Sequence, residues 1–208
     1  PRPTLFPYTT LFRSHSVVLY DGEKYYNDKP THSHDMSVEC GNENIIAFDK
    51  ALTSQDGNLY INGEAAQTAD NYYVLPAGNY YLAENVSLNG DIYILNNVKL
   101  CLNGKTLNMG ENCIEIHMFG NILSICDCGA TGTITGAHCN SSSVSALLMV
   151  MGECKLYGGT VHNNTSSDQT DSTSAISVYG GDVKIFGGKV IAEHDNAIYT
   201  TPASTSSL

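Results

Sequence analysis

The stretch "VKLCLNGKTL", residues 98–107, alternates apolar and polar residues as a strand does, and then breaks at Asn103-Gly104. Three later stretches have the same form, namely "LSICDCGATGTIT" (123–135), "CKLYGGTV" (154–161) and "VKIFGGKV" (183–190). Each combines a short alternating strand, a break of small residues, and then Thr or Lys followed by an aliphatic residue. The chain therefore repeats a unit of strand, corner and strand.

Aligning the four units places their apolar residues in three columns. The first column is Leu100, Ile125, Leu156 and Ile185, which recur at similar but not identical intervals. The second is Cys101, Cys126, Tyr157 and Phe186, and the third, beyond the break, is Leu107, Ile134, Val161 and Val190. Another strand is expected before each later unit, in 113–121, 146–153 and 175–182, with Ala146 and Ala175 at equivalent positions.

A period of this length, built from short strands and turns, is typical of a solenoid, because a single repeat cannot bury its own apolar face. Stacked repeats place equivalent strands side by side in parallel, about 4.8 Å apart. Each coil must turn a corner, and Gly and Asn supply the positive φ that corners use. We therefore expect corners at Asn103-Gly104, Gly158-Gly159 and Gly187-Gly188. An Asn-Gly pair also suggests a hairpin, but the later units repeat the break without repeating that pair.

Composition agrees with an all-β fold. The 208 residues include 13 Tyr, five Phe, no Trp and 19 Gly, which favours strands and turns over helices. The first residues are a separate matter, because "TLFPYTTLFRS" (4–14) resembles a translated sequencing adapter. We exclude residues 1–14 from the fold and expect them to pack against nothing. The alternative is an aromatic N-terminal arm.

Net charge limits the partners. Both arginines, Arg2 and Arg13, lie in the excluded segment, so eight Lys remain against 21 acidic residues, a formal charge of −13. Nucleic acid and anionic membrane surfaces attract Lys-rich and Arg-rich proteins, so neither is an expected partner. The longest apolar run, 146–151, is far shorter than the roughly 20 residues of a membrane-spanning helix.

The cysteines are best interpreted as small buried thiols. There are seven, so at least one lies outside any disulfide within this chain. Cys126 and Cys128 form a C-x-C pair, but the second pair of a zinc site is missing. The full set is Cys40, Cys101, Cys113, Cys126, Cys128, Cys139 and Cys154.

Four segments resemble one known family, the right-handed parallel β-helix repeats of large secreted surface proteins from Gram-positive gut bacteria. They are "HSHDMSVECGNENIIAFDKALTS" (32–54), "LPAGNYYLAENVSL" (75–88), "VKLCLNGKTL" (98–107) and "LSICDCGATGTITG" (123–136). The resemblance implies a right-handed single-stranded parallel β-helix with the pectate-lyase-like fold. It also implies secretion, display at the bacterial cell surface, and adhesion or polysaccharide contact, with the signal peptide and anchor outside this chain.

We accordingly expect three regions. Residues 1–14 are adapter-derived, 15–68 form an irregular, partly stranded flank, and 69–208 form about four coils of a β-helix. The segment "NAIYTTPASTSSL" (196–208) begins a further coil without completing it. We expect it to leave the layer lined by Val183, Ile185 and Val190 open, so that copies associate end to end.

The same fold carries pectate lyases and polygalacturonases, so catalysis must be considered. A lyase of this kind uses an arginine base and carboxylate-held calcium, and no arginine follows residue 13. The outward lysines Lys99, Lys155 and Lys184 recur at equal register, as in a solvated ladder. Glycoside hydrolysis needs two carboxylates about 5–5.5 Å apart for retention or about 6.5–9.5 Å apart for inversion. Glu153 and Asp182 are equivalent residues of neighbouring repeats.

We interpret Glu153 and Asp182 as turn residues, because each follows a Gly at a corner where Asn121 stands in the preceding repeat. The remaining candidates are metal ligands, and they are weak. His32, His34 and Cys40 would give zinc three ligands, and Asp168 with Asp171 lies in a polar segment that we interpret as a loop.

No nucleotide-binding motif is present. Because the candidate residues above are also better interpreted as structural, we assign no catalytic, cofactor-binding or metal-binding residue. We expect a non-catalytic extracellular module for adhesion or carbohydrate contact, with a polysaccharide or cell-surface glycan as its partner. The alternatives are a polysaccharide lyase or glycoside hydrolase, and an inert spacer.

Overall fold

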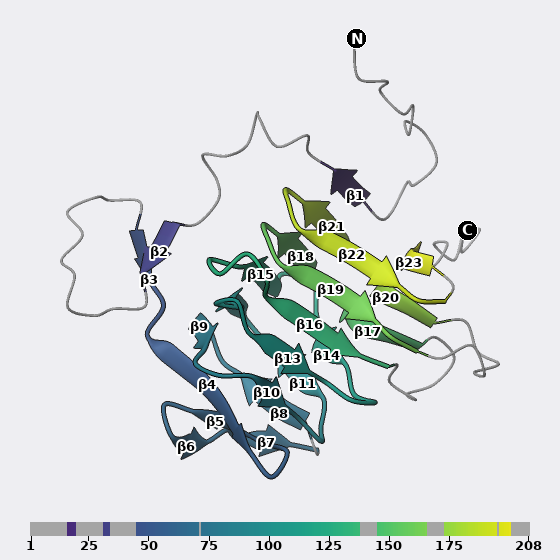
Figure 1. Cartoon of the computed structure of the whole chain (residues 1–208). Coiled ribbons are helices and arrows are strands. Elements are labelled where there is room, and N and C mark those ends of the chain that lie inside the picture. The colour runs from purple at the N-terminus through teal and green to yellow at the C-terminus, as the bar shows by residue number, and fades with distance from the viewer. Residues whose placement is uncertain are drawn as a thin grey trace.

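The computed structural model is all-β and describes residues 16–19, 31–33, 45–70, 72–137, 145–165, 173–194 and 196–200. Three large sheets, with nine, five and seven strands, make up most of this part of the chain (Figure 1). A pair of short strands, β2 (Thr31–Ser33) and β3 (Ile45–Ala47), stands apart from them. The described residues contain no helix.

The nine-stranded sheet has the order β1-β21-β18-β15-β12-β9-β4-β5-β6. Its neighbours are parallel except at the β4–β5 and β5–β6 pairs, which are antiparallel. The strands are β1 (Ser16–Leu19), β4 (Lys50–Gln55), β5 (Asn58–Ile61), β6 (Glu64–Ala65), β9 (Gly78–Leu82), β12 (Asn97–Cys101), β15 (Ile122–Cys126), β18 (Glu153–Leu156) and β21 (Asp182–Ile185).

The neighbours in the other two large sheets are also parallel, except for one antiparallel pair at the first edge of the seven-stranded sheet. The five-stranded sheet contains β10 (Val86–Ser87), β13 (Thr106–Asn108), β16 (Thr133–Gly136), β19 (Thr160–Asn163) and β22 (Lys189–Ala192), in that order. The seven-stranded sheet runs from β7 (Thr68–Ala69) through β8 (Tyr72–Leu75), β11 (Ile92–Ile94), β14 (Ile114–Ile116), β17 (Ser145–Val150) and β20 (Thr173–Val178) to β23 (Asn196–Thr200).

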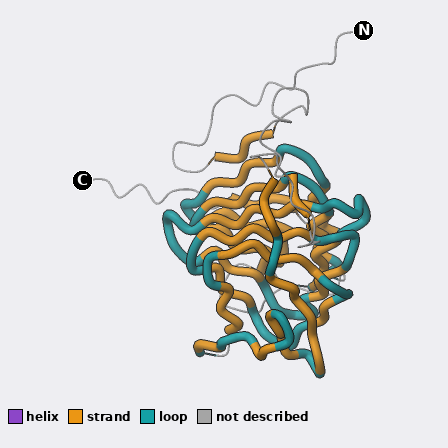
Figure 2. The backbone as a smooth tube through the Cα atoms, turned by 90° about the vertical axis from the view of Figure 1, so that its left-hand side faces the viewer, coloured by secondary structure: helices purple, strands orange, loops and turns teal. Residues whose placement is uncertain are grey.

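From β8 onward each strand pairs in parallel with the strand three elements later, as β9 does with β12 and β12 with β15. The chain therefore contributes one strand to each large sheet in turn. Figure 2 shows the resulting ladders of strands stacked one above another. This all-β arrangement of parallel sheets is compatible with a β-solenoid.

Strand register confirms the three predicted columns. Leu100 pairs with Ile125, Ile125 with Leu156, and Leu156 with Ile185. The column that starts at Leu107 continues through Ile134, Val161 and Val190. In the remaining column Cys101 pairs with Cys126, and the rings of Tyr157 and Phe186 stack with centroids 4.6 Å apart. Side chains at equal register thus stack on one another from repeat to repeat.

The expected match of Ala146 with Ala175 is wrong by one position. Ala146 pairs with Ser174, and Leu148 pairs with Ile176. The register expected from the repeat is restored at the next strand, where Glu153 pairs with Asp182. Gly180, with φ of 80°, allows the later corner to hold the extra residue. The preceding corner also differs from expectation, because Glu153 pairs with Ile122 and not with Asn121.

The predicted corners connect the nine-stranded sheet to the five-stranded sheet. Asn103 and Gly104 have φ of 53° and 68°, and Gly159 and Gly188 each have φ of 86°. The Asn103 amide also donates to the backbone oxygen of Leu82 in the preceding repeat, at 3.0 Å. These corners therefore use positive φ, and the first of them adds a side-chain hydrogen bond to the preceding repeat.

The core lies between the sheets and is formed by the inward columns. Leu100, Ile125 and Leu156 are at most 2% exposed. Burying each such side chain stabilises the fold by roughly 1.5–3 kcal/mol. A second inward column, Val98, Leu123, Cys154 and Val183, runs through the same strands. Cys154 therefore occupies an aliphatic position, as the interpretation of buried thiols requires.

The segment expected to be a flank contributes strands to the nine-stranded sheet. β4 pairs in parallel with β9 and so continues the nine-stranded sheet. The turns at Asp56-Gly57 and Asn62-Gly63, all with positive φ, reverse the chain into the antiparallel strands β5 and β6. The predicted boundary between residues 68 and 69 falls within β7.

The end that was expected to stay open is covered in part, at the β21 edge. β1 pairs in parallel with β21, placing Val17 beside Val183 and Leu19 beside Ile185 (Figure 1). A sheet edge accepts any strand that offers matching backbone groups, which the expectation overlooked. Val183 is fully buried, whereas Val190 is partly buried. Residues 1–14 lie outside the described part of the chain.

Candidate binding face

An aromatic stack runs across the outer side of the seven-stranded sheet. The ring centroids of Tyr72 in β8 and Tyr93 in β11 are 3.8 Å apart, and the ring planes are nearly parallel, at 10°. The ring of His117, just after β14, stacks on Tyr93 at 5.0 Å and 28°. We call these three residues the aromatic stack. All three are partly exposed, so their ring edges reach solvent.

Glu115 supplies a carboxylate beside the stack. It pairs in register with Tyr93, and its Oε1 lies 3.3 Å from Nδ1 of His117. Only 12% of the Glu115 side chain is exposed, against 41% for His117. Burial, assisted by the hydrogen bond with Tyr72, raises the pKa of Tyr93 well above its ordinary value. The Tyr93 phenol therefore keeps its proton and remains a hydrogen-bond donor.

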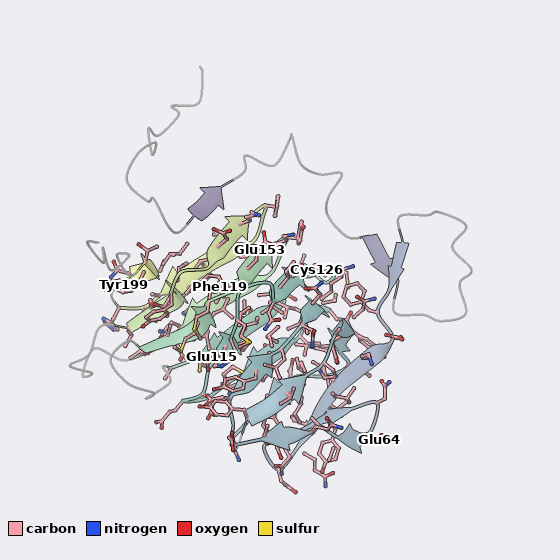
Figure 3. All side chains as sticks on the ribbon, turned by 180° about the vertical axis from the view of Figure 1, so that it is seen from behind. Glu64, Glu115, Phe119, Cys126, Glu153 and Tyr199 are labelled. Carbon is pink, nitrogen blue, oxygen red and sulfur yellow. The ribbon has the colours of Figure 1, made fainter. Side chains whose placement is uncertain are left out.

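The turn that follows the stack exposes two apolar side chains. Phe119 is 78% exposed and Met118 is 60% exposed, the two highest values among the exposed large apolar residues of the described chain. Both are within two residues of His117, and Figure 3 labels Phe119 and Glu115. We call the aromatic stack, Glu115, Met118 and Phe119 together the stack face.

The stack face offers two kinds of contact. Its aromatic rings are packed against one another, so a ligand meets their edges and the phenol groups rather than the ring faces. Phe119 provides an open ring surface, whereas Glu115 is buried and its Oε1 lies beside Nδ1 of His117. Apolar rings beside polar edge groups suit a ligand with both C–H faces and hydroxyl groups, such as a sugar.

The predicted carboxylate pair lies elsewhere, on the outer side of the nine-stranded sheet. Glu153 and Asp182 are register partners, as expected from the repeat. Oε2 of Glu153 is 3.4 Å from Nζ of Lys155, and its Oε1 contacts Nζ of Lys184. Lys155 and Lys184 also share a column with Lys99, which is separated from them by Ser124. Two lysines thus neutralise Glu153, as in a ladder of surface ion pairs.

The metal candidates fall mainly outside what the structure describes. Asp168, Asp171, His34 and Cys40 are outside the described residues, and only the backbone of His32, in β2, is placed. Among the described residues, no group of three or more His, Cys, Asp or Glu side chains could hold a metal ion.

No protein family, curated protein or solved structure matches this chain. In the part of the chain that the structure describes, no helix is long and apolar enough to cross a membrane. The assignment of function therefore rests on the chemistry of the stack face.

Sequence reasoning missed the stack face. Its residues come from strands whose spacing along the chain is irregular, since the step from Ile92 to its partner Ile114 is much shorter than the step from Ile114 to Leu148. The outward positions also hold unlike side chains, because Tyr93, Glu115 and Met149 follow one another in register. The one available signal was the outward placement of aromatic residues in "YYVL" and "IYI".

Proposed function

We propose that this chain is a right-handed single-stranded parallel β-helix that serves as a non-catalytic repeat module and contacts carbohydrate at a bacterial cell surface. The architecture is supported by the rotation of successive strands through three parallel sheets. The extracellular location is supported by the resemblance of residues 32–54, 75–88, 98–107 and 123–136 to surface-protein repeats.

The observation that carries carbohydrate contact is the stack face. Phe119 exposes 78% of its surface directly after a partly exposed stack of two tyrosines and a histidine. Exposed aromatic residues close to polar groups mark interaction sites more often than isolated apolar residues do. The acidic chain, with a formal charge of −11, favours a neutral glycan over a polyanionic one.

Binding to immobilised polysaccharide tests this function. The immobilised probes are β-glucan as the neutral polysaccharide, mucin as the glycoprotein and polygalacturonate as the anionic polysaccharide. We expect Phe119→Ala to weaken glycan binding about tenfold, which corresponds to ~1.4 kcal/mol. Ile191→Ala is the matched control, because Ile191 is also an exposed apolar residue, at 40%, but lies in the five-stranded sheet.

Three outcomes separate the alternatives. Equal loss of binding in Phe119→Ala and Ile191→Ala would contradict the stack face as the site. Absence of binding to every probe would favour an inert spacer. Cleavage of a uronate or neutral polysaccharide that Asp182→Ala abolishes would favour a lyase or hydrolase, for which the register pairing of Glu153 with Asp182 is the supporting observation.

A further inference from the structure

Two thiols from neighbouring repeats lie close together at one corner of the fold. Cys101 is the last residue of β12, and Cys128 follows the end of β15 by two residues. Their sulfur atoms are 3.6 Å apart. Because β12 and β15 are adjacent parallel strands, a bond between these sulfurs would link one repeat to the next.

The two thiols differ in access to solvent. Cys101 is fully buried in a small apolar cluster with Phe48 and Cys126, on which Tyr81 and Tyr157 pack. Cys128 is exposed, and its sulfur also lies 3.4 Å from Oδ1 of Asn103. A reagent from solution can therefore reach Cys128 first, while Cys101 is already in place behind it.

We propose that Cys101 and Cys128 form an intramolecular disulfide that ties adjacent repeats together. The co-reactant is a small disulfide such as oxidised glutathione. The Cys128 thiolate attacks one sulfur of that disulfide, which forms a mixed disulfide and releases one thiol. The Cys101 thiolate then attacks the Cys128 sulfur and releases the second thiol. Two protons leave the protein thiols, and the two electrons reduce the small disulfide.

The surroundings of the Cys128 thiol determine how the rate of disulfide formation depends on pH. Partial desolvation of the thiol, followed by the hydrogen bond with Cys101, raises the pKa of Cys128 to about 11. The thiolate is the attacking species, so few Cys128 side chains react at neutral pH. We expect the rate of disulfide formation to rise about tenfold per pH unit from pH 7 until it levels off near the pKa.

The bond has a structural consequence that can be measured. It closes the chain between residues 101 and 128, which restricts the unfolded chain more than the folded one. The bond crosses from the corner after β12 to the corner after β15, so it covalently links two coils that hydrogen bonds and packing otherwise hold. The oxidised protein should therefore unfold at a higher temperature than the reduced protein.

Peptide mapping by mass spectrometry of the full chain, after treatment with oxidised glutathione, tests the proposal. We expect one peptide pair joined through Cys101 and Cys128, with a rise in thermal midpoint that dithiothreitol reverses. Cys128→Ser should lose both the linked peptide and the rise. Cys126→Ala is the matched control, because Cys126 pairs in register with Cys101 and should not be needed.

Several results would overturn the proposal. They are a bridge from Cys101 to Cys126, a bridge to Cys40 or Cys139, and a protein that stays fully reduced at pH 9 under an excess of oxidised glutathione. If Cys126→Ala fails to fold, the wild-type peptide map and the exposed-site variant Cys128→Ser still decide. A disulfide-linked peptide pair that persists in Cys128→Ser would also contradict the proposed bond between Cys101 and Cys128.

Discussion

Asp127 lies at the corner after β15 and accepts three backbone hydrogen bonds. Its Oδ1 accepts from the N–H groups of Gly104 and Gly129, at 2.7 and 3.1 Å, and its Oδ2 accepts from Gly132 at 2.7 Å. Gly104 belongs to the preceding repeat, so one carboxylate binds backbone groups of its own corner and of the neighbouring repeat. Asp127 is only 6% exposed, which strengthens these bonds.

We expect Asp127→Ala to lower the free energy of unfolding by about 3 kcal/mol, since buried N–H groups lose a charged acceptor. Urea denaturation gives this value directly. Asp127→Asn should cost less, because its single oxygen still accepts on one side. A loss below about 0.5 kcal/mol for the alanine variant would show that water replaces the carboxylate without penalty.

Cys154 predicts how stability depends on alkaline pH. Burial, with a smaller contribution from Glu153, raises the pKa of this thiol from 9.0 to about 12. Below pH 9 the thiol is protonated in folded and unfolded chains alike, so its contribution is fully present. As pH rises from 9 towards 12 the unfolded chain ionises first, and stability falls by about 1 kcal/mol per unit.

Cys154→Val isolates this effect, because valine suits the column of Val98, Leu123 and Val183. Urea unfolding at pH 8, 9, 10 and 11 should show a shallower decline for the variant than for the wild type. Parallel curves for the two proteins would mean that the Cys154 thiol does not ionise on unfolding.

At the scale of strands and corners, Gly159 shows what a corner demands. Its φ is 86°, and a Cβ there would lie 2.5 Å from Cδ1 of Leu102 and 3.2 Å from the Gly132 oxygen. Gly120 has a similar φ of 91° but no atom within 4 Å of a Cβ. The two glycines thus share a backbone conformation and differ in packing.

Gly159→Ala should therefore destabilise more than Gly120→Ala. Both variants carry the left-handed backbone cost of about 1–2 kcal/mol, and the corner adds about 1–3 kcal/mol of overpacking against buried Leu102. Thermal and urea unfolding of the pair measure the difference. Equal losses would show that the corner relaxes to admit a side chain.

The inward strand positions could be predicted from the sequence because burial selects the same kind of side chain in every repeat. Leu100, Ile125 and Leu156 are an example, because each is an aliphatic residue at the same position of its repeat and all three were predicted to share one column. Outward positions repeat in the nine-stranded sheet, where Lys155 pairs with Lys184, but in the seven-stranded sheet the outward partners Tyr93 and Glu115 are unlike. Nothing in the sequence therefore linked Tyr93 to Glu115 before their strands were paired. Asn-Gly was also ambiguous, since Asn62-Gly63 makes a hairpin and Asn103-Gly104 makes a corner between parallel sheets. The difference lies in the strand after the turn, which pairs antiparallel with the strand before it in the hairpin and joins another sheet in the corner.

At the scale of the whole molecule, the N-terminal residues divide at β1. Residues 1–14 belong to no repeat column, and we expect their deletion to leave the thermal midpoint unchanged. Deleting residues 1–20 also removes β1, which pairs with β21, and should lower the midpoint. Differential scanning calorimetry compares the two. A clear drop on removing 1–14 alone would mean that the adapter-like segment packs against the fold.

Beside the last repeat, two of the three large sheets end in a strand without a further neighbour in the described chain. β22 and β23 are the terminal strands of the five-stranded and seven-stranded sheets, whereas β1 covers β21. Exposed strand edges promote pairing with another copy. We expect sedimentation velocity to show association that grows with concentration. A strict monomer at high concentration would show that these edges are protected.

The central claim is that successive repeats stack in parallel register through three sheets. A crystal structure of the chain measures this most directly, through the Cα positions of Leu100, Ile125, Leu156 and Ile185. We predict that they lie in one line on one sheet, with neighbours about 4.8 Å apart. Placement of these residues on different faces, or separations well beyond one strand spacing, would contradict the account.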